Sequence, residues 1–309
     1  MTEDPIRRIS LIGFGEAGGI FGHDLAAAGF EVAMYDILLN AAPARAGMLE
    51  KAQLAKVRAC DTLAEAIRGA YLVISAVTAS AALHAAECAA PLLSLGQIYL
   101  DINSVSPETK RAIAGAMETY LATFVEAAVM APVAPQRLRV PVLLGGPAAA
   151  AAAPRLQAIG MNARPISERV GVASAIKMCR SIIIKGLEAI TVESLLTARR
   201  YGAEKEVLDS LAATYPGMGW DGALPDYLVS RVAEHGKRRA AEMREAAQTI
   251  REAGLEPLTA LATAERQEWL ARVIAESSVR LAPGEPFEWQ KLAEAIVEAT
   301  ALKTESGRH

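Results

Sequence analysis

Six consecutive residues near the amino terminus carry glycine at the first, third and sixth positions. They are Gly13, Phe14, Gly15, Glu16, Ala17 and Gly18. The first glycine permits a tight turn, the second lets the backbone approach a pyrophosphate, and the third allows a helix to pack closely on a strand. The free N–H groups at the start of that helix attract an anion. Since an apolar run precedes the motif and a helix-forming run follows it, the motif predicts a dinucleotide-binding loop.

An acidic residue, Asp36, follows the next apolar run, Glu31–Tyr35. A carboxylate at this place accepts hydrogen bonds from ribose hydroxyl groups and repels a 2′-phosphate, so it favours NAD over NADP. Arg45 is a nearby cation that could hold a phosphate, which leaves NADP open. The alternative is an ordinary glycine-rich turn, but the strand, the helix and the acid together favour the nucleotide site.

Lys177 lies in the long run Val170–Ala198, which lacks proline and is apolar on nearly all of its faces. At 3.6 residues per turn, Lys177 and Ser181 share one stripe of the expected helix. Burial and the neighbouring cation of Arg180 are expected to lower the pKa of the amine, so that it serves as a general acid or base. Ser181 is expected to orient the amine or hold a substrate hydroxyl. The alternative is a structural ion pair with an acid such as Glu188.

The first half of the chain alternates between short apolar runs and helix-forming runs, which would position these groups. The expected strands are Arg8–Ile12, Glu31–Tyr35, Lys56–Ala59, Tyr71–Ser75, Gln97–Leu100, Thr123–Val129, Val140–Leu144 and a segment near Asn162. The expected helices are Ala17–Ala28, Thr62–Gly69, Ser80–Ala90, one that starts near Pro107, and one at Ala148–Ala153. Repeated strand–helix units predict a doubly wound, mainly parallel sheet with both faces covered.

From about Ile166 the pattern is helical. Helices are expected at Val170–Ala198, Ala203–Ala213, Leu224–Ala253, Leu258–Glu276 and Phe287–Ala299. We therefore predict an α/β Rossmann domain over residues 1–166. An all-helical substrate and dimerisation domain is predicted over residues 167–309, beginning with a long interdomain helix. The apolar character of that helix predicts a homodimer whose helical domains pack together.

The composition argues against several classes of function. Lys and Arg number 32 against 35 Asp and Glu, so the net charge of −3 gives no electrostatic basis for binding nucleic acid or an anionic membrane. The uncharged stretch Gly69–Ala86 contains polar residues and is expected to be a strand and a helix rather than a membrane span. Cys60, Cys88 and Cys179 lack the spacing of metal ligands, and no metal site is expected. Without a visible targeting signal, the chain is expected to be cytoplasmic.

A Rossmann domain followed by a long helix and a helical domain resembles the β-hydroxyacid dehydrogenases, which include 3-hydroxyisobutyrate and 6-phosphogluconate dehydrogenases. The segment Asp101-Ile102-Asn103-Ser104 is similar to a segment of the phosphogluconate enzyme near the nicotinamide and the substrate. The segment Gly171–Ser181 is similar to the catalytic GxGxxxKxxxN motif and places Lys177 on the catalytic lysine. The KMCRS and HGKRRAAEM runs resemble a less characterised branch whose helical domain has no assigned function.

This resemblance implies further contacts. Val77 and Asn103 would lie near the nicotinamide, Ser104 and Ser181 would contact the substrate, and Arg180 would clamp an anion. The substrate-binding Ser-Gly-Gly turn of the family corresponds to Met130-Ala131-Pro132, so N–H donors for a carboxylate are partly lost.

Several positions of the lysine motif depart from the family. Ala173 stands at the second glycine, Ser181 at the asparagine, and Arg180 at the histidine of the phosphogluconate enzyme. Ile184 stands at the glutamate that donates a proton in decarboxylation. The resemblance therefore implies a reaction without decarboxylation.

Two features of the helical half extend the set of candidate substrate contacts. A basic cluster at His235, Lys237, Arg238 and Arg239 is expected to hold an anionic substrate through Arg239. Its alternative is a solvated helix face with an Arg238–Glu242 pair. The glycine-rich loop Tyr215–Gly222 is expected to be a mobile lid that places Trp220 over the substrate, or a long turn that this tryptophan anchors.

Together these patterns predict an NAD(P)-dependent oxidoreductase that acts on a small molecule. It would interconvert a hydroxy acid, or a related alcohol, and its carbonyl form, with Lys177 as the general acid or base. One alternative is C=N reduction of the imine reductase type, although imine reductases generally lack the lysine. The other is a nucleotide-binding regulator without turnover, which would have no need of Lys177.

Overall fold

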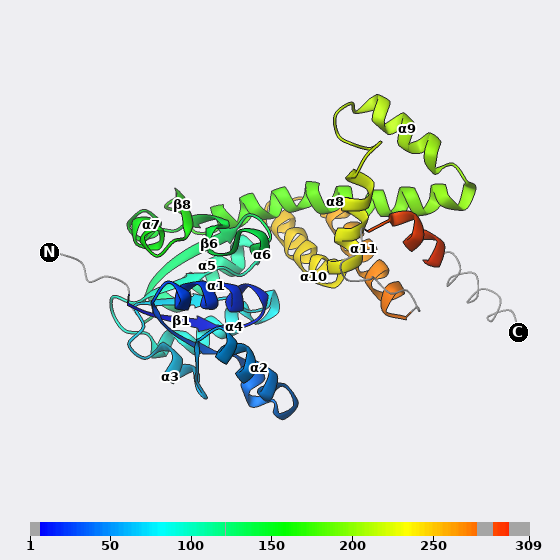
Figure 1. Cartoon of the computed structure of the whole chain (residues 1–309). Coiled ribbons are helices and arrows are strands. Elements are labelled where there is room, and N and C mark those ends of the chain that lie inside the picture. Colours follow the sequence, from blue (N-terminus) through cyan, green and yellow to red (C-terminus); the bar gives the residue numbers. More distant parts are fainter. Residues whose placement is uncertain (1–6, 121, 277–286, 297–309) are drawn as a thin grey trace, which may run out of the picture. The chain divides into compact units, whose positions relative to one another are not determined.

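The computed structural model describes residues 7–120, 122–276 and 287–296 (Figure 1). The chain divides into two compact units, Met1–Met178 and Cys179–His309. No helix in the described part of the chain is both long enough and apolar enough to cross a membrane.

The first unit is built on one eight-stranded sheet. Its strands are β1 (Arg8–Ile12), β2 (Glu31–Tyr35), β3 (Arg58–Ala59), β4 (Leu72–Ser75), β5 (Ile98–Asp101), β6 (Thr123–Val129), β7 (Pro141–Gly145) and β8 (Asn162–Ser167). The strand order is β3-β2-β1-β4-β5-β6-β7-β8, and every neighbouring pair is parallel except β6 and β7. The prediction of a doubly wound, mainly parallel sheet is confirmed. The strand order reverses between β1 and β4, where doubly wound sheets bind their ligands.

Helices cover both faces of this sheet. They are α1 (Glu16–Ala27), α2 (Ala42–Leu54), α3 (Leu63–Ile67), α4 (Ala82–Ala89), α5 (Pro107–Glu118), α6 (Val133–Gln136) and α7 (Ala149–Ala158). Successive strand residues point to opposite faces, so Leu72 and Ile74 join one core cluster while Val73 joins the other. Helix α2 was not predicted from the sequence, because it buries only Met48 and Ala52, too few apolar positions to show a helical period.

The second unit is helical. The long helix α8 (Val172–Tyr201) begins in the first unit and is followed by α9 (Glu204–Thr214), α10 (Leu224–Glu252) and α11 (Leu258–Glu276). Residues 289–296 are also helical, and the last three residues of the helix expected at Phe287–Ala299 lie outside the described residues. The core of the unit contains Val192, Val232, Leu270 and Trp289. Gly236 allows α10 and α11 to approach, since a Cβ there would lie 2.5 Å from the carbonyl oxygen of Gln267.

Candidate active site

The glycine loop connects β1 to α1 at the reversal point of the sheet. Gly13 has a φ of +87°, and a Cβ on it would lie 2.5 Å from the carbonyl oxygen of Ala76. A Cβ on Gly18 would lie 2.2 Å from the carbonyl oxygen of Gly13. By contrast, a Cβ on Gly15 would meet no atom within 4 Å. Two of the glycines are therefore required by the fold, whereas Gly15 faces open space of the kind a phosphate group needs.

The amino terminus of α1 has the features of an anion site. The helix starts at Glu16, and its N-cap residue, Gly15, supplies no side-chain cap. The first N–H groups of a helix have no partner within the helix, and the helix dipole adds a partial positive charge there. This arrangement leaves backbone donors at the open side of the loop.

Asp36 is bound to the glycine loop. Its Oδ2 accepts a hydrogen bond from the N–H of Phe14 at 2.7 Å, and its Oδ1 accepts one from Leu38 at 2.9 Å. A carboxylate has about four acceptor sites, so both oxygens retain capacity for ribose hydroxyl groups. Arg45 donates to the carbonyl of Leu39 at 2.8 Å and to Asp61 at 2.6 Å, so the cation that left NADP open is engaged by an acid.

Lys51, a residue not predicted from the sequence to be part of the site, reaches the same loop from α2. Its Nζ donates to the carbonyl oxygens of Phe14 and Gly15, both at 2.6 Å. Burial lowers the pKa of Lys51, and the charges of Asp36 and Glu16 oppose part of this shift. Lys51 thus fixes the orientation of two loop peptides. The helix that carries it showed no clear apolar period, so the sequence held no signal for this contact.

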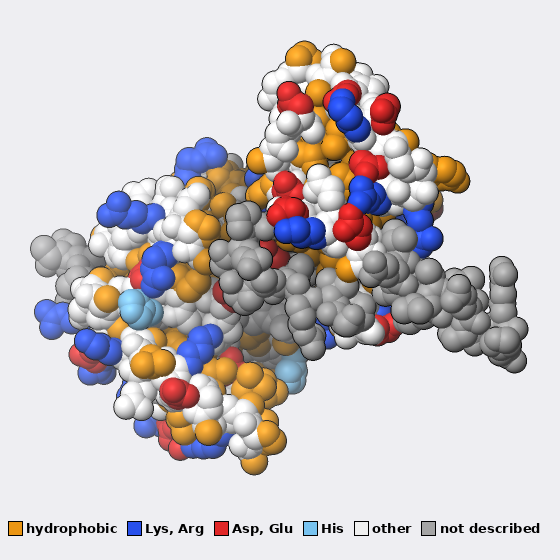
Figure 2. Space-filling model, turned by 45° about the vertical axis from the view of Figure 1, so that its right-hand side comes forward, with side chains coloured by type: hydrophobic (Ala, Val, Ile, Leu, Met, Phe, Trp, Pro, Cys, Tyr) orange, Lys and Arg blue, Asp and Glu red, His pale blue; other side chains and the backbone are white. Residues whose placement is uncertain are grey.

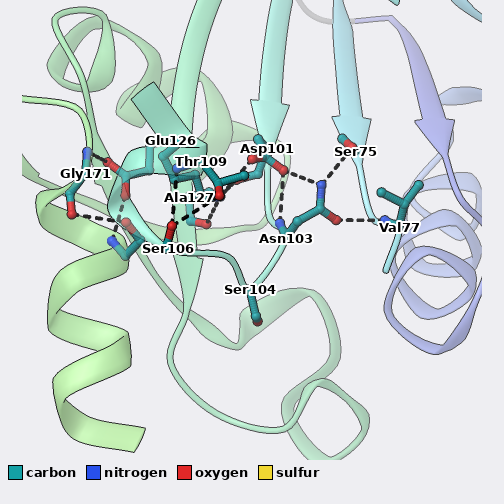
Figure 3. A network of polar contacts seen from close by, with 12 residues as sticks. Ser75, Val77, Asp101, Asn103, Ser104, Ser106, Thr109, Glu126, Ala127 and Gly171 are labelled. Carbon is teal, nitrogen blue, oxygen red and sulfur yellow. Dashed lines mark hydrogen bonds and ion pairs between the residues drawn. The ribbon is translucent and has the colours of Figure 1, made fainter. Parts of the chain in front are cut away.

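A buried polar network lies at the carboxyl end of β5 (Figure 3). Asp101 and Lys110 are fully buried and form an ion pair of 2.9 Å, and Lys110 also donates to the carbonyl of Asp101 at 2.8 Å. The other carboxylate oxygen of Asp101 accepts from the backbone N–H of Asn103 at 3.1 Å and from its side-chain amide. Lys110 precedes Ile113, Ala114 and Met117 by three, four and seven residues. That spacing places Lys110 on the buried face of α5, so the sequence pattern alone could have indicated a buried lysine that needs a partner.

Asn103 joins the loops that follow β4 and β5 (Figure 3). Its side-chain oxygen accepts from the N–H of Val77 at 2.7 Å, and its amide nitrogen donates to the Ser75 hydroxyl at 2.9 Å. Asn103 is only 5% exposed, so its amide is used inside the protein. The structure thus brings Val77 and Asn103 together, and Asn103 positions the loop that carries Val77.

Lys177 forms a hydrogen bond with Ser104, the residue that follows Asn103. The amine of Lys177, on the second turn of α8, donates to the hydroxyl oxygen of Ser104 at 2.5 Å. Both side chains are half-buried. The alternative partner, Glu188, accepts hydrogen bonds from Arg239 and Gln267 within the second unit. The structure therefore pairs Lys177 with a hydroxyl group that the resemblance assigns to the substrate site.

The turn expected to bind a carboxylate retains few donors. The N–H of Met130 donates to the carbonyl of Pro141 at 2.9 Å, and Pro132 has no N–H. The N–H of Ala131, in the same turn, has no hydrogen-bond acceptor among the described residues.

Arg239 and Ser181 are engaged within the helical unit. Arg239 is 8% exposed and donates to both oxygens of Glu188, at 2.8 and 2.7 Å. Burial raises the pKa of Glu188, and Arg239 opposes part of that rise. Ser181 accepts from Lys185 at 3.1 Å, and Lys185 pairs with Glu242 at 2.6 Å. These contacts favour structural roles for Arg239 and Ser181.

The structure favours a long turn anchored by Trp220 over a mobile lid, and a solvated helix face over an anion site at the basic cluster. Trp220 is 5% exposed, so it anchors its loop instead of lying open over a ligand. Arg238 contacts Glu242 at 3.4 Å, the i,i+4 pair expected of a solvated face. Arg180, in contrast, is exposed on α8, three residues after Lys177. Among the described residues, no group of three His, Cys, Asp or Glu side chains is arranged to hold a metal.

Residues 8–167, about half of the chain, match the family model described as the NAD binding domain of 6-phosphogluconate dehydrogenase. The chain belongs to this family. Residues 198–270 match a second model, described as a domain of unknown function (DUF1932). The resemblance to β-hydroxyacid dehydrogenases with a helical carboxyl-terminal domain is therefore confirmed.

Several known proteins are similar to this chain over most of its length. A conserved hypothetical protein from Sinorhizobium meliloti 1021 is 36% identical, with a TM-score of 0.75 over 96% of this chain and 98% of that one. A 3-hydroxyisobutyrate dehydrogenase from Pseudomonas aeruginosa is 27% identical over 225 residues, which are 69% of this chain and 71% of the relative. The Mycobacterium tuberculosis 3-hydroxyisobutyrate dehydrogenase with L-serine has a TM-score of 0.69 at 15% identity, covering 94% and 98% of the two chains, and shows the fold alone.

The cofactor of this NAD-binding family member is NAD(P), and the loop geometry fits it. The open space at Gly15 and the uncapped start of α1 lie together, as a pyrophosphate requires. The acceptor oxygens of Asp36 are tied to the same loop.

Proposed function

We propose that this chain is an NAD(P)-dependent dehydrogenase that interconverts a hydroxy acid, or a related alcohol, and its carbonyl form. The contact between Lys177 and Ser104 carries this proposal. It places an amine beside the loop of Asn103, which is bound to Val77 next to the glycine loop. A proton-transfer group at the carboxyl ends of the strands, close to the cofactor loop, is the arrangement that alcohol oxidation needs.

The proposed chemistry assigns the proton to Lys177. Bound NAD⁺ supplies the hydride acceptor, and in reduction the reduced cofactor supplies the hydride. In oxidation, neutral Lys177 removes the hydroxyl proton of the substrate while the carbon gives up its hydride. In reduction, protonated Lys177 donates to the forming alkoxide. Ser104, which already bonds to the amine, orients it and holds the substrate hydroxyl.

The remaining substrate contacts are proposed from what the geometry leaves available. In the first unit, the N–H of Ala131 is a donor suited to a carboxylate. Arg180, the anion clamp that the family resemblance implies, is an exposed cation on α8. Arg239, Ser181 and Trp220 are assigned positioning roles, because each is buried. Ile184 offers no proton donor, so the proposed reaction does not include decarboxylation.

Turnover by the purified chain tests this function. The reduced-nicotinamide absorbance is followed with NAD and NADP in parallel, using 3-hydroxyisobutyrate, L-serine, sugar acids and aryl-substituted hydroxy acids. Cyclic imines are tested separately with the reduced cofactors. Turnover of any hydroxy acid supports the proposal. Reduction of cyclic imines with no turnover of hydroxy acids supports the imine reductase alternative. NAD binding without turnover of either class supports the regulator alternative.

Asp36→Asn is expected to weaken NAD binding roughly tenfold, since a hydrogen bond to a charged group is worth about 1.5 kcal/mol or more. The amide also loses one acceptor for Phe14 or Leu38. NADP binding is expected to weaken less, because a charge that repels the 2′-phosphate is removed. Fluorescence titration with the reduced cofactors, NADH and NADPH, measures both constants, with Asp209→Asn, an exposed acid of α9, as the control. An unchanged ratio of the two affinities would contradict the ribose assignment.

We propose further that α8 pairs with a second copy of the chain. Ile176, Ile183 and Ile190 are 41%, 73% and 60% exposed and recur every seven residues. This spacing makes an apolar stripe typical of paired helices. The neighbouring helix α9 buries none of its residues. Exposed hydrophobic side chains (orange) appear around it in the upper part of Figure 2.

Ile183→Asp combined with Ile190→Asp is expected to convert a dimer into a monomer, because two charges would be buried in the interface. Light scattering coupled to size exclusion measures the mass. Leu95→Asp, which changes an 84% exposed residue of the first unit, should leave the dimer intact. A dimer that survives the α8 double variant would show that another surface forms the contact.

A further inference from the structure

One carboxylate on the central sheet has no part in the chemistry described above. Glu126 lies in the middle of β6, in the otherwise apolar run TFVEAAV, and is fully buried. Its Oε2 accepts from the N–H of Gly171 at 2.7 Å, and its Oε1 accepts from the N–H of Ser174 at 2.6 Å. Figure 3 shows these contacts beside the Asp101 network. A charge inside an apolar strand is costly unless it has such partners.

The two donors belong to the start of the helix that carries Lys177. The first N–H groups of a helix lack internal partners, and a negative charge there is favoured by the helix dipole. In α3 and α5 the residue just before the first turn, Thr62 or Ser106, provides such a cap. In α8 the cap comes from a strand 45 residues away in sequence. Both hydrogen bonds are charge-assisted, so they bind the first turn of α8 firmly to β6.

The surroundings of Glu126 are shaped for this contact. Gly145 is its partner on β7, and a Cβ there would lie 2.4 Å from Oε2 of Glu126. Gly171 has a φ of +100°, and a Cβ on it would lie 3.1 Å from the Cβ of Pro107. Side chains at either glycine would therefore displace the carboxylate or the helix start.

The residue that pairs with Glu126 on the neighbouring strand helps to position Ser104, the partner of Lys177. Glu126 pairs in register with Asp101 on β5, the buried acid that binds Lys110 and Asn103. Asn103 is followed directly by Ser104. Two carboxylates that are neighbours across β5 and β6 thus act on opposite sides of the 2.5 Å contact between Lys177 and Ser104. Glu126 binds the helix that carries Lys177, and Asp101 binds Asn103, the residue before Ser104. Ser174 and Lys177 are three residues apart on α8, less than one helical turn.

We propose that Glu126 is a positioning residue that holds the amine of Lys177 against Ser104 by capping α8 from the sheet. The importance of this for catalysis rests on the proposed function. The geometry itself is independent of that function, so the test measures the reactivity of the Lys177 amine directly.

The test is competitive acetylation of Lys177 by acetic anhydride, read by mass spectrometry against exposed Lys56 of the same molecule. In Glu126→Gln, one amide oxygen replaces one acceptor and the NH₂ group faces the other N–H donor. The labelling of Lys177 relative to Lys56 should rise roughly threefold to tenfold, which corresponds to the net contribution of one hydrogen bond. Hydrogen exchange at the amides of Gly171 and Ser174 should accelerate by a similar factor. Glu87→Gln, at an exposed position of α4, is the matched control and should change neither.

A second variant removes a donor and keeps the acid. Ser174→Pro deletes the N–H that donates to Glu126, in the first turn of α8, and with it the hydroxyl bond to the carbonyl of Gly171. It should raise the labelling of Lys177 in the same way, with Ser174→Ala, which loses only the hydroxyl, as its control. The Glu126→Gln effect should shrink in a Ser104→Ala background, because the contact through which it acts is already lost. A folded Glu126→Gln protein with reduced thermal stability and wild-type labelling of Lys177 would overturn the proposal. Absence of turnover in the wild-type chain would overturn the proposed function and leave this measurement intact.

Discussion

Lys177→Met is expected to lower kcat/KM for a substrate of this chain by about 10²–10⁴-fold, the usual contribution of a general acid or base. Methionine preserves the length and the apolar stem of the side chain and removes the amine that donates to Ser104. The dissociation constant for NAD should stay within about twofold of the wild-type value, since the glycine loop and Asp36 are on other elements. Steady-state turnover and a cofactor titration on the same sample measure both quantities.

The control for this variant is Lys205→Met, which removes an exposed lysine of α9 that pairs with Asp209. It should leave turnover unchanged. Lys177→Ala supplemented with small alkylamines should recover part of the lost rate, because a free amine can occupy the space that the side chain vacates. Full activity of Lys177→Met would remove the proton-transfer role of the lysine.

Lys110→Met is expected to lower the free energy of unfolding of the first unit by about 3–5 kcal/mol, the cost of leaving one partner of a buried ion pair alone. Lys110 and Asp101 are both fully buried, and their contact is 2.9 Å. Asp101 also holds Asn103, so the loss should reach the loops of Val77 and Ser104. Urea denaturation followed by circular dichroism measures the stability, and NAD titration measures the effect on the site.

The exposed Lys205→Met variant again serves as the reference and should leave the unfolding transition unchanged, because an exposed ion pair adds little to stability. The double variant Lys110→Met with Asp101→Leu should recover part of the stability, because no charge then remains buried without a partner. It should not recover NAD binding, since Asp101→Leu removes both hydrogen bonds that Asn103 makes to Asp101. Equal stability of Lys110→Met and the wild-type chain would show that water or another group replaces the amine.

Local pattern was sufficient to predict much of the first unit. The expected bounds of β1, β2 and β6 agree with the structure, because a short, almost continuously buried apolar run and its flanking turns are properties of five to seven consecutive residues. The glycine loop was equally predictable, since its strand, turn and helix lie within about twenty residues. Lys177 was predicted as the general acid or base from a helix with one charged stripe and from a motif resemblance.

The contacts that organise the site could not be predicted in the same way. Lys51 binds the loop across 36 and 37 residues, and Glu126 caps α8 across 45 and 48. A charged residue inside β6 and one on the buried stripe of α5 signalled that partners were needed. Neither signal named the partner, because strand order and register determine which residues meet.

The expectations for the helical unit show the same division. Its helices follow from periodicity and length, and their expected positions agree closely with α8, α10 and α11. Whether Arg239 faces a ligand or another side chain depends on Glu188, 51 residues away, and the burial of Trp220 depends on how its loop packs. Sequence alone thus sufficed for the local elements and for naming candidate reactive groups. Their partners and their exposure depend on the packing of distant segments, because the hydrogen bonds and burial that orient a side chain exist only once those segments meet.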